Sequence, residues 1–101
     1  MKKYKAFALV SFKNIPYNVP TAIIEALCYS EDYAERLYNQ ILEKLPEDRY
    51  LCLYGFNTTA IVDFLTDRLE DEKDEHNRNI LLQRLVLNAD IIRRSYEHYG
   101  R

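Results

Sequence analysis

Residues 4–12 alternate between the two faces of an extended chain. One face carries five apolar side chains: Tyr4, Ala6, Ala8, Val10 and Phe12. The opposite face is polar at its ends, but Phe7 and Leu9 make its centre apolar. A period of two with aromatic residues predicts a strand. Because both faces are apolar at the centre, we expect a central strand that is partly covered on both sides.

Residues 22–45 allow two interpretations. The 3–4 spacing of their apolar residues fits one helix over 21–45. Alternatively, residues 22–29 form a second strand, and Ser30 caps a helix that begins at Glu31 and ends before Pro46. The serine hydroxyl accepts a free backbone N–H, and acidic residues favour the positive end of the helix dipole. These signals favour a strand followed by a helix.

The string CYSEDYAERLYNQI, residues 28–41, also favours this interpretation. It resembles a pattern in small, uncharacterised phage and mobile-element accessory proteins, where a β-hairpin ends in an aromatic–serine pair and enters a helix. The resemblance covers residues 4–45 and implies a hairpin-then-helix start. These proteins share no established activity, so the resemblance implies nothing catalytic. By analogy it implies an inhibitor of a host defence complex, an anti-CRISPR-like role.

Residues 49–57, RYLCLYGFN, are an apolar and aromatic run that predicts a third, buried strand. Gly55 inside this run indicates a bulge or a close backbone approach. The polar residues 57–59 then cap a helix that extends to Leu69. Residues 70–79 contain no apolar side chain, so the helical region either continues exposed to water or breaks near 76–79.

A final helix is predicted from Ile80 to Tyr99. It carries one apolar stripe that begins at Leu81 and a second formed by Ile80, Leu87 and Ile91. A helix that packs on a core normally needs one stripe. The second stripe therefore needs a cover, which is another helix, another protein or a second copy in a homodimer.

Together these elements predict one α+β domain over residues 1–101 with the order ββαβα. A right-handed crossover places the first strand in the middle of a three-stranded antiparallel sheet, in the order 2-1-3. We expect the helices to cover one face of this sheet. The alternative is βαβα, with residues 21–45 as one helix.

Charge and cysteine content narrow the function classes. Fourteen basic and sixteen acidic side chains give a net charge of −2, whereas a generic nucleic-acid binder needs surplus cations. Nucleic-acid binding or regulation is therefore the second hypothesis. It requires a basic patch of Arg93, Arg94 and Arg101 to converge on one surface with the lysines near the start of the chain, Lys2, Lys3, Lys5 and Lys13. Cys28 and Cys52 form no CxxC pair, which predicts reduced core thiols in a cytoplasmic protein. No segment has the length of a membrane span.

Catalytic and cofactor motifs are missing from the sequence. Two glycines 45 positions apart cannot form a phosphate-binding loop. Cys28 has no electropositive neighbourhood that would activate it as a nucleophile. A metal site would draw on Glu72, Glu75 and His76, with His98 as a further candidate. Glu72 and His76 are four positions apart and could share a helical face, but one histidine among acids is usually a solvated surface. We therefore expect no catalytic, cofactor or metal site, and an enzyme is the third hypothesis.

Nine tyrosines in 101 residues are the strongest deviation in composition. Tyrosine supplies a large contact area at low entropic cost and is enriched at protein interfaces. The candidates for exposure are Tyr17, Tyr33, Tyr38, Tyr96 and Tyr99. A dense acidic run could dock on a basic groove of a partner; its carboxylates are Glu70, Asp71, Glu72, Asp74 and Glu75. The first hypothesis is a protein-binding module whose partner is a larger host complex.

Overall fold

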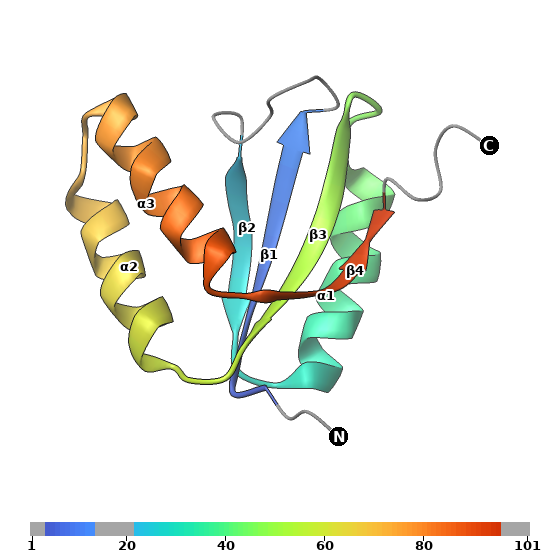
Figure 1. Ribbon diagram of the computed structural model, residues 1–101. Coiled ribbons are helices and arrows are strands. Elements are labelled where there is room, and N and C mark those ends of the chain that lie inside the picture. The colour runs from blue at the N-terminus through green and yellow to red at the C-terminus, as the bar shows by residue number, and fades with distance from the viewer. Residues whose placement is uncertain (1–3, 14–21, 96–101) are drawn as a thin grey trace.

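A computed structural model describes residues 4–13 and 22–95 of this chain (Figure 1). Its elements in order are β1 (Ala6–Lys13), β2 (Ile23–Cys28), α1 (Glu31–Lys44), β3 (Arg49–Phe56), α2 (Ala60–Asp71), α3 (Glu75–Leu87) and β4 (Asp90–Arg94). The strands form an antiparallel sheet in the order β2-β1-β3-β4. The predicted α+β class is confirmed. The predicted antiparallel order 2-1-3 of the first three strands is confirmed, but the predicted number of strands is wrong, because β4 adds a fourth strand beside β3.

The hairpin and the first helix follow the favoured interpretation of residues 22–45. β2 pairs with β1 from Phe7 opposite Cys28 onward, so the alternative of one helix over 21–45 is wrong. The side chain of Ser30 accepts a hydrogen bond from the Tyr33 backbone N–H at 3.4 Å. At the other end of α1, Leu45 is extended before Pro46. The serine cap and the proline therefore delimit the helix.

The predicted final helix over residues 80–99 is wrong. α3 ends at Leu87, where the Asn88 side-chain amide donates to the Arg84 carbonyl at 2.8 Å. The sequence DIIRR then forms β4 instead of continuing the helix. Its two isoleucines favour a strand once the open edge of β3 offers backbone partners. Residues 96–101 lie outside the described residues.

The helical region does break, but at residues 72–74 and not near 76–79. The Asp74 side chain accepts a hydrogen bond from the Asn77 backbone N–H at 3.1 Å and starts α3. This cap explains the earlier break, because an aspartate at this position satisfies a free N–H of the new helix. None of the helices that the structure describes has both the length and the apolar content needed to cross a membrane.

Helices cover both faces of the sheet, so the expectation of one covered face is wrong. Figure 1 shows α1 on one side and the α2–α3 hairpin on the other. The α1 side packs on Phe7, Leu9, Leu51 and Leu53, while alternate residues such as Val10 face the hairpin. In β1 and β3 the side chains on both faces of the sheet are apolar, so each face needs a cover. The prediction that the first strand is covered on both sides is confirmed.

Each edge strand of the sheet contains one extra residue. In β2, Glu25 lies between Ala26, which pairs with Leu9, and Ile24, which pairs with Val10. In β4, Ile92 takes the same kind of position between Ile91 and Arg93. Such bulges re-aim a side chain and protect an open edge from further pairing. Both bulged residues direct their side chains to the α1 face.

Gly55 lies where three chain segments meet closely. A Cβ atom at this position would lie 2.6 Å from Cγ of Tyr4 and 2.8 Å from Cδ1 of Ile92. These distances are shorter than van der Waals contact, so only glycine fits without a shift of its neighbours. The close approach predicted from the sequence is confirmed.

Candidate interaction surfaces

Helix α3 is apolar on two sides. Leu81, Leu82 and Leu85 are buried against the sheet. On the outside, 38% of Ile80 and 81% of Leu87 are exposed. Both exposed residues belong to the second stripe that the sequence predicted. The third member of that stripe, Ile91, is also exposed but lies on β4, so the prediction of three residues on one helix is wrong.

The exposed side chains of α2 and α3 form a continuous strip. The Arg68 guanidinium carbon lies 5.6 Å from the ring centroid of Phe64, which is itself 54% exposed. Arg68, Ile80 and Arg84 line a shallow pocket of about 270 Å³ between the two helices. Leu87 follows Arg84 by three positions and is its neighbour on the next turn. We call these five residues the hairpin outer face.

The predicted acidic run lies at the turn between α2 and α3. Asp74 caps α3, and Glu72 accepts a hydrogen bond from the Asn77 side-chain amide at 3.4 Å. Glu75 begins α3, where a carboxylate favours the positive end of the dipole. Glu70 and Asp71 lie exposed in the last turn of α2, where the dipole disfavours negative charge. Helix stability therefore explains Asp74 and Glu75 but not Glu70 and Asp71.

The α2–α3 hairpin carries a net negative charge, as does the segment of residues 31–48 that contains α1. Residues 60–87 carry seven carboxylates and four lysine or arginine side chains, a net charge of −3. The whole chain carries −2. The hairpin therefore presents both the exposed apolar strip and an excess of negative charge.

The described tyrosines divide into exposed and buried ones. Tyr33 is half exposed in the first turn of α1. Tyr38 is only 4% exposed, so its predicted exposure is wrong. It lies on the core side of α1, and burial raises its pKa, which the nearby Arg93 partly opposes. Tyr17, Tyr96 and Tyr99 lie outside the described residues.

Tyr29 is an exposed tyrosine that the sequence did not single out. Its hydroxyl donates a hydrogen bond to Oδ1 of Asp63 at 2.7 Å and so links the start of α1 to α2. This hydrogen bond to a carboxylate is the main reason that the pKa of Tyr29 is raised. An aromatic residue directly before the helix cap was the only signal in the sequence.

The predicted basic patch is divided between the two faces of the sheet. Arg93 faces α1, forms a 2.9 Å ion pair with Glu35 and lies 5.2 Å from the Tyr38 ring centroid. Arg94 pairs with Cys52 in the register and so faces the hairpin side. Arg101 lies outside the described residues. These positions do not favour the nucleic-acid hypothesis.

The two cysteines are free and buried. Burial raises the pKa of the Cys28 thiol, and a backbone hydrogen bond at Ser30 partly opposes this. Burial also raises the pKa of Cys52 to about 11. Both thiols are therefore protonated and poorly nucleophilic near neutral pH. In residues 4–13 and 22–95, no group of three or more His, Cys, Asp or Glu side chains could hold a metal ion.

A polar row across the sheet was missed by the sequence analysis. Ser11 of β1 donates a hydrogen bond from its hydroxyl to Oε2 of Glu25 of β2 at 2.6 Å. Arg49 of β3 donates from Nε to the Ser11 hydroxyl oxygen at 3.0 Å and from Nη2 to the Ser11 carbonyl at 2.9 Å. Ser11 and Arg49 are buried. The available signal was a polar residue in or beside each apolar run, with Glu25 inside β2, Ser11 near the end of β1 and Arg49 at the start of β3.

Comparison of this chain with protein-family models, with curated proteins and with solved structures finds no match. Two surfaces of the described residues carry chemistry that the core does not need. These are the hairpin outer face and the polar row beside α1.

Proposed function

We propose that this chain is a non-enzymatic protein-binding module that docks through the hairpin outer face. The observation that carries the proposal is the exposure of Leu87, 81%, on a helix whose opposite side is buried core. Ile80 lies on the same helix, and Phe64 lies on its neighbour. Single exposed apolar residues are common, whereas several in one strip are typical of interaction sites.

The composition of the strip supports the same conclusion. Arg68 and Arg84 lie between the apolar residues, and arginine and aromatic side chains are enriched at the centres of protein interfaces. The excess of carboxylates on the hairpin would attract a basic partner and raise its rate of association. The proposed partner therefore has a basic surface with an apolar depression.

The narrower proposal is that this partner is a bacterial defence complex with a basic nucleic-acid channel. Two features support it: the net charge of −3 on residues 60–87 and the resemblance of residues 28–41 to phage and mobile-element accessory proteins. A module that occupies such a channel would act as an inhibitor without any chemistry of its own.

The test measures binding of the purified chain to a panel of purified bacterial effector complexes. We expect the double variant Ile80→Ser, Leu87→Ser to weaken binding by at least about 30-fold, because such a change removes central apolar contacts worth about 2 kcal/mol or more. Ile23→Ser is the matched control, since it removes an apolar side chain that is about half exposed on β2. Its binding should equal that of the unaltered chain.

Three outcomes would contradict the proposal. The first is the absence of binding to every complex in the panel, and the second is an equal loss of binding in the control variant. The third is a dimer in light scattering that the double variant disrupts, because the strip would then be covered by a second copy.

A further inference from the structure

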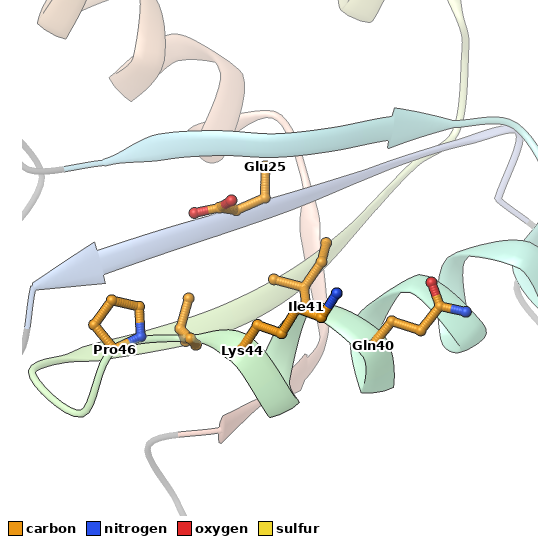
Figure 2. A pocket seen from close by; sticks show the side chains of 6 residues that line it. Glu25, Gln40, Ile41, Lys44 and Pro46 are labelled. Carbon is orange, nitrogen blue, oxygen red and sulfur yellow. The ribbon is translucent and has the colours of Figure 1, made fainter.

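A second pocket lies on the opposite side of the molecule, between the edge strand β2 and the C-terminal half of α1. Its volume is about 340 Å³, at the small end of the range for ligand pockets. It is lined by Glu25, Gln40, Ile41, Lys44, Leu45 and Pro46. Figure 2 shows Glu25 on the strand side and Gln40, Ile41 and Lys44 on the helix side.

The strand side of this pocket holds an exposed carboxylate that a hydrogen bond orients. Glu25 is the extra residue of the β2 bulge, which turns its side chain toward α1. The Ser11 hydroxyl holds Oε2 of this carboxylate at 2.6 Å, and buried Arg49 holds Ser11 from behind. Burying a guanidinium and a hydroxyl costs more than an apolar pair would. The polar row orients Glu25 despite this cost. Because Ser11 donates to Oε2, the Oε1 atom of Glu25 can accept a hydrogen bond from a ligand.

The helix side supplies the opposite charge and an aliphatic wall. Lys44 carries an ammonium group, and Gln40 carries an amide that can donate and accept. Ile41, Leu45 and Pro46 form the apolar part of the lining. Within the part of the chain that the structure describes, no ion pair joins Lys44 to Glu25.

We propose that this pocket binds a small zwitterion, namely an α-amino acid with an aliphatic side chain. Its ammonium group pairs with Glu25, its carboxylate pairs with Lys44, and its side chain lies against Ile41 and Leu45. A simple cation would face Lys44 and a simple anion would face Glu25, so neither suits the lining alone. An added peptide strand is disfavoured because the bulge interrupts the edge of β2.

The test is a titration of the isotopically labelled chain with L-leucine, followed by amide chemical shifts. We expect saturable shifts at Glu25, Ile41 and Lys44. Leucinamide lacks the carboxylate and 4-methylpentanoate lacks the ammonium group. Each should bind about two- to fivefold more weakly than leucine, because each loses one charge pair at an exposed site.

Two variants assign the charges to the pocket. Glu25→Gln and Lys44→Met should each weaken leucine binding by about two- to fivefold. Glu43→Gln is the matched control, because Glu43 is an exposed carboxylate on α1 that does not line the pocket. Circular dichroism checks that each variant is folded.

The proposal fails if leucine causes no saturable shift at the pocket, or if the two analogues bind as tightly as leucine. It also fails if folded Glu25→Gln binds leucine as the unaltered chain does. The analogue series uses the unaltered chain, so a variant that does not fold leaves the test intact. The binding of a partner protein at the hairpin outer face is measured separately and does not depend on this result.

Discussion

The two faces of the sheet are covered in different ways. On one face, a single helix, α1, turns its apolar side to the sheet and exposes mostly charged and polar side chains. On the other face, α3 buries three leucines and still exposes Ile80 and Leu87. Between the two covers, β1 is buried from Ala6 to Phe12.

This difference distinguishes the apolar side chains that the core requires from the apolar side chains that remain exposed. The α1 side reaches its packing with one apolar stripe, which is what a helix on a sheet requires. The α2–α3 side has the same requirement, and Leu81, Leu82 and Leu85 meet it. The apolar side chains on its outside do not contribute to that core. They are therefore available for contact with another molecule.

The largest expected change in the free energy of unfolding comes from comparing substitutions on the two sides of α3. Leu85 is 1% exposed, so Leu85→Ala should lower the free energy of unfolding by about 3 kcal/mol through lost burial and a cavity. Leu87→Ala should change it by no more than about 0.5 kcal/mol. Urea denaturation measures both. Equal losses would show that the outer side of α3 is part of the folding core.

The next effect concerns the α1 face at Gly55. Gly55→Ala should destabilise the fold by about 2 kcal/mol, because the new Cβ overlaps the Tyr4 ring and the Ile92 side chain. Ile92→Ala should relieve part of this overlap, so the double variant should lose less than the sum of the single losses. Strict additivity in urea denaturation would contradict the close packing at this point.

Alkaline pH should destabilise the chain through groups on both faces. The pKa of Cys52, on the hairpin side, rises from 9.0 to about 11 on folding. Between these values the unfolded thiol loses its proton while the folded one keeps it, so stability falls as pH rises. The loss should reach about 2 kcal/mol. Urea denaturation across this window should show a shallower slope in Cys52→Ala.

The pKa of Tyr38, on the α1 side, is also raised by burial, from its ordinary value of 10.0. Its contribution has the same sign and begins at higher pH than that of Cys52. Tyr38→Phe should therefore flatten only the upper part of the curve. If neither variant changes the dependence of the free energy of unfolding on pH, other groups determine the loss of stability at alkaline pH.

The smallest effect compares one exposed arginine on each side. Arg93→Met removes an ion pair to Glu35 and a contact with the Tyr38 ring, and should cost about 1 kcal/mol. Arg68→Met removes only the contact with Phe64 that the structure shows, and should cost about 0.5 kcal/mol. Added salt should reduce the first loss more than the second. A larger loss for Arg68 would indicate that the hairpin outer face contributes to folding.

The sequence by itself determined the parts of the fold that rest on local signals. Ser30 and Pro46 delimit α1 through a cap and a backbone restriction, and both act within a few residues. The two-sided burial of β1 follows from the apolar residues at both parities of one short segment. Helical spacing was also sufficient to place Ile80 and Leu87 together on the outside of a core helix.

Tertiary structure alone decided the features that depend on partners far along the chain. Ile91 and Ile92 continue the helical apolar spacing of the residues before them. The open edge of β3 nevertheless supplies backbone partners that make residues 90–94 a strand. Tyr38 is buried because the sheet packs against α1 and β4 places Arg93 beside the tyrosine ring. The pocket beside α1 needs Ser11, Glu25 and Arg49 from three different strands. Strand register joins these residues, and register arises only when the whole sheet assembles.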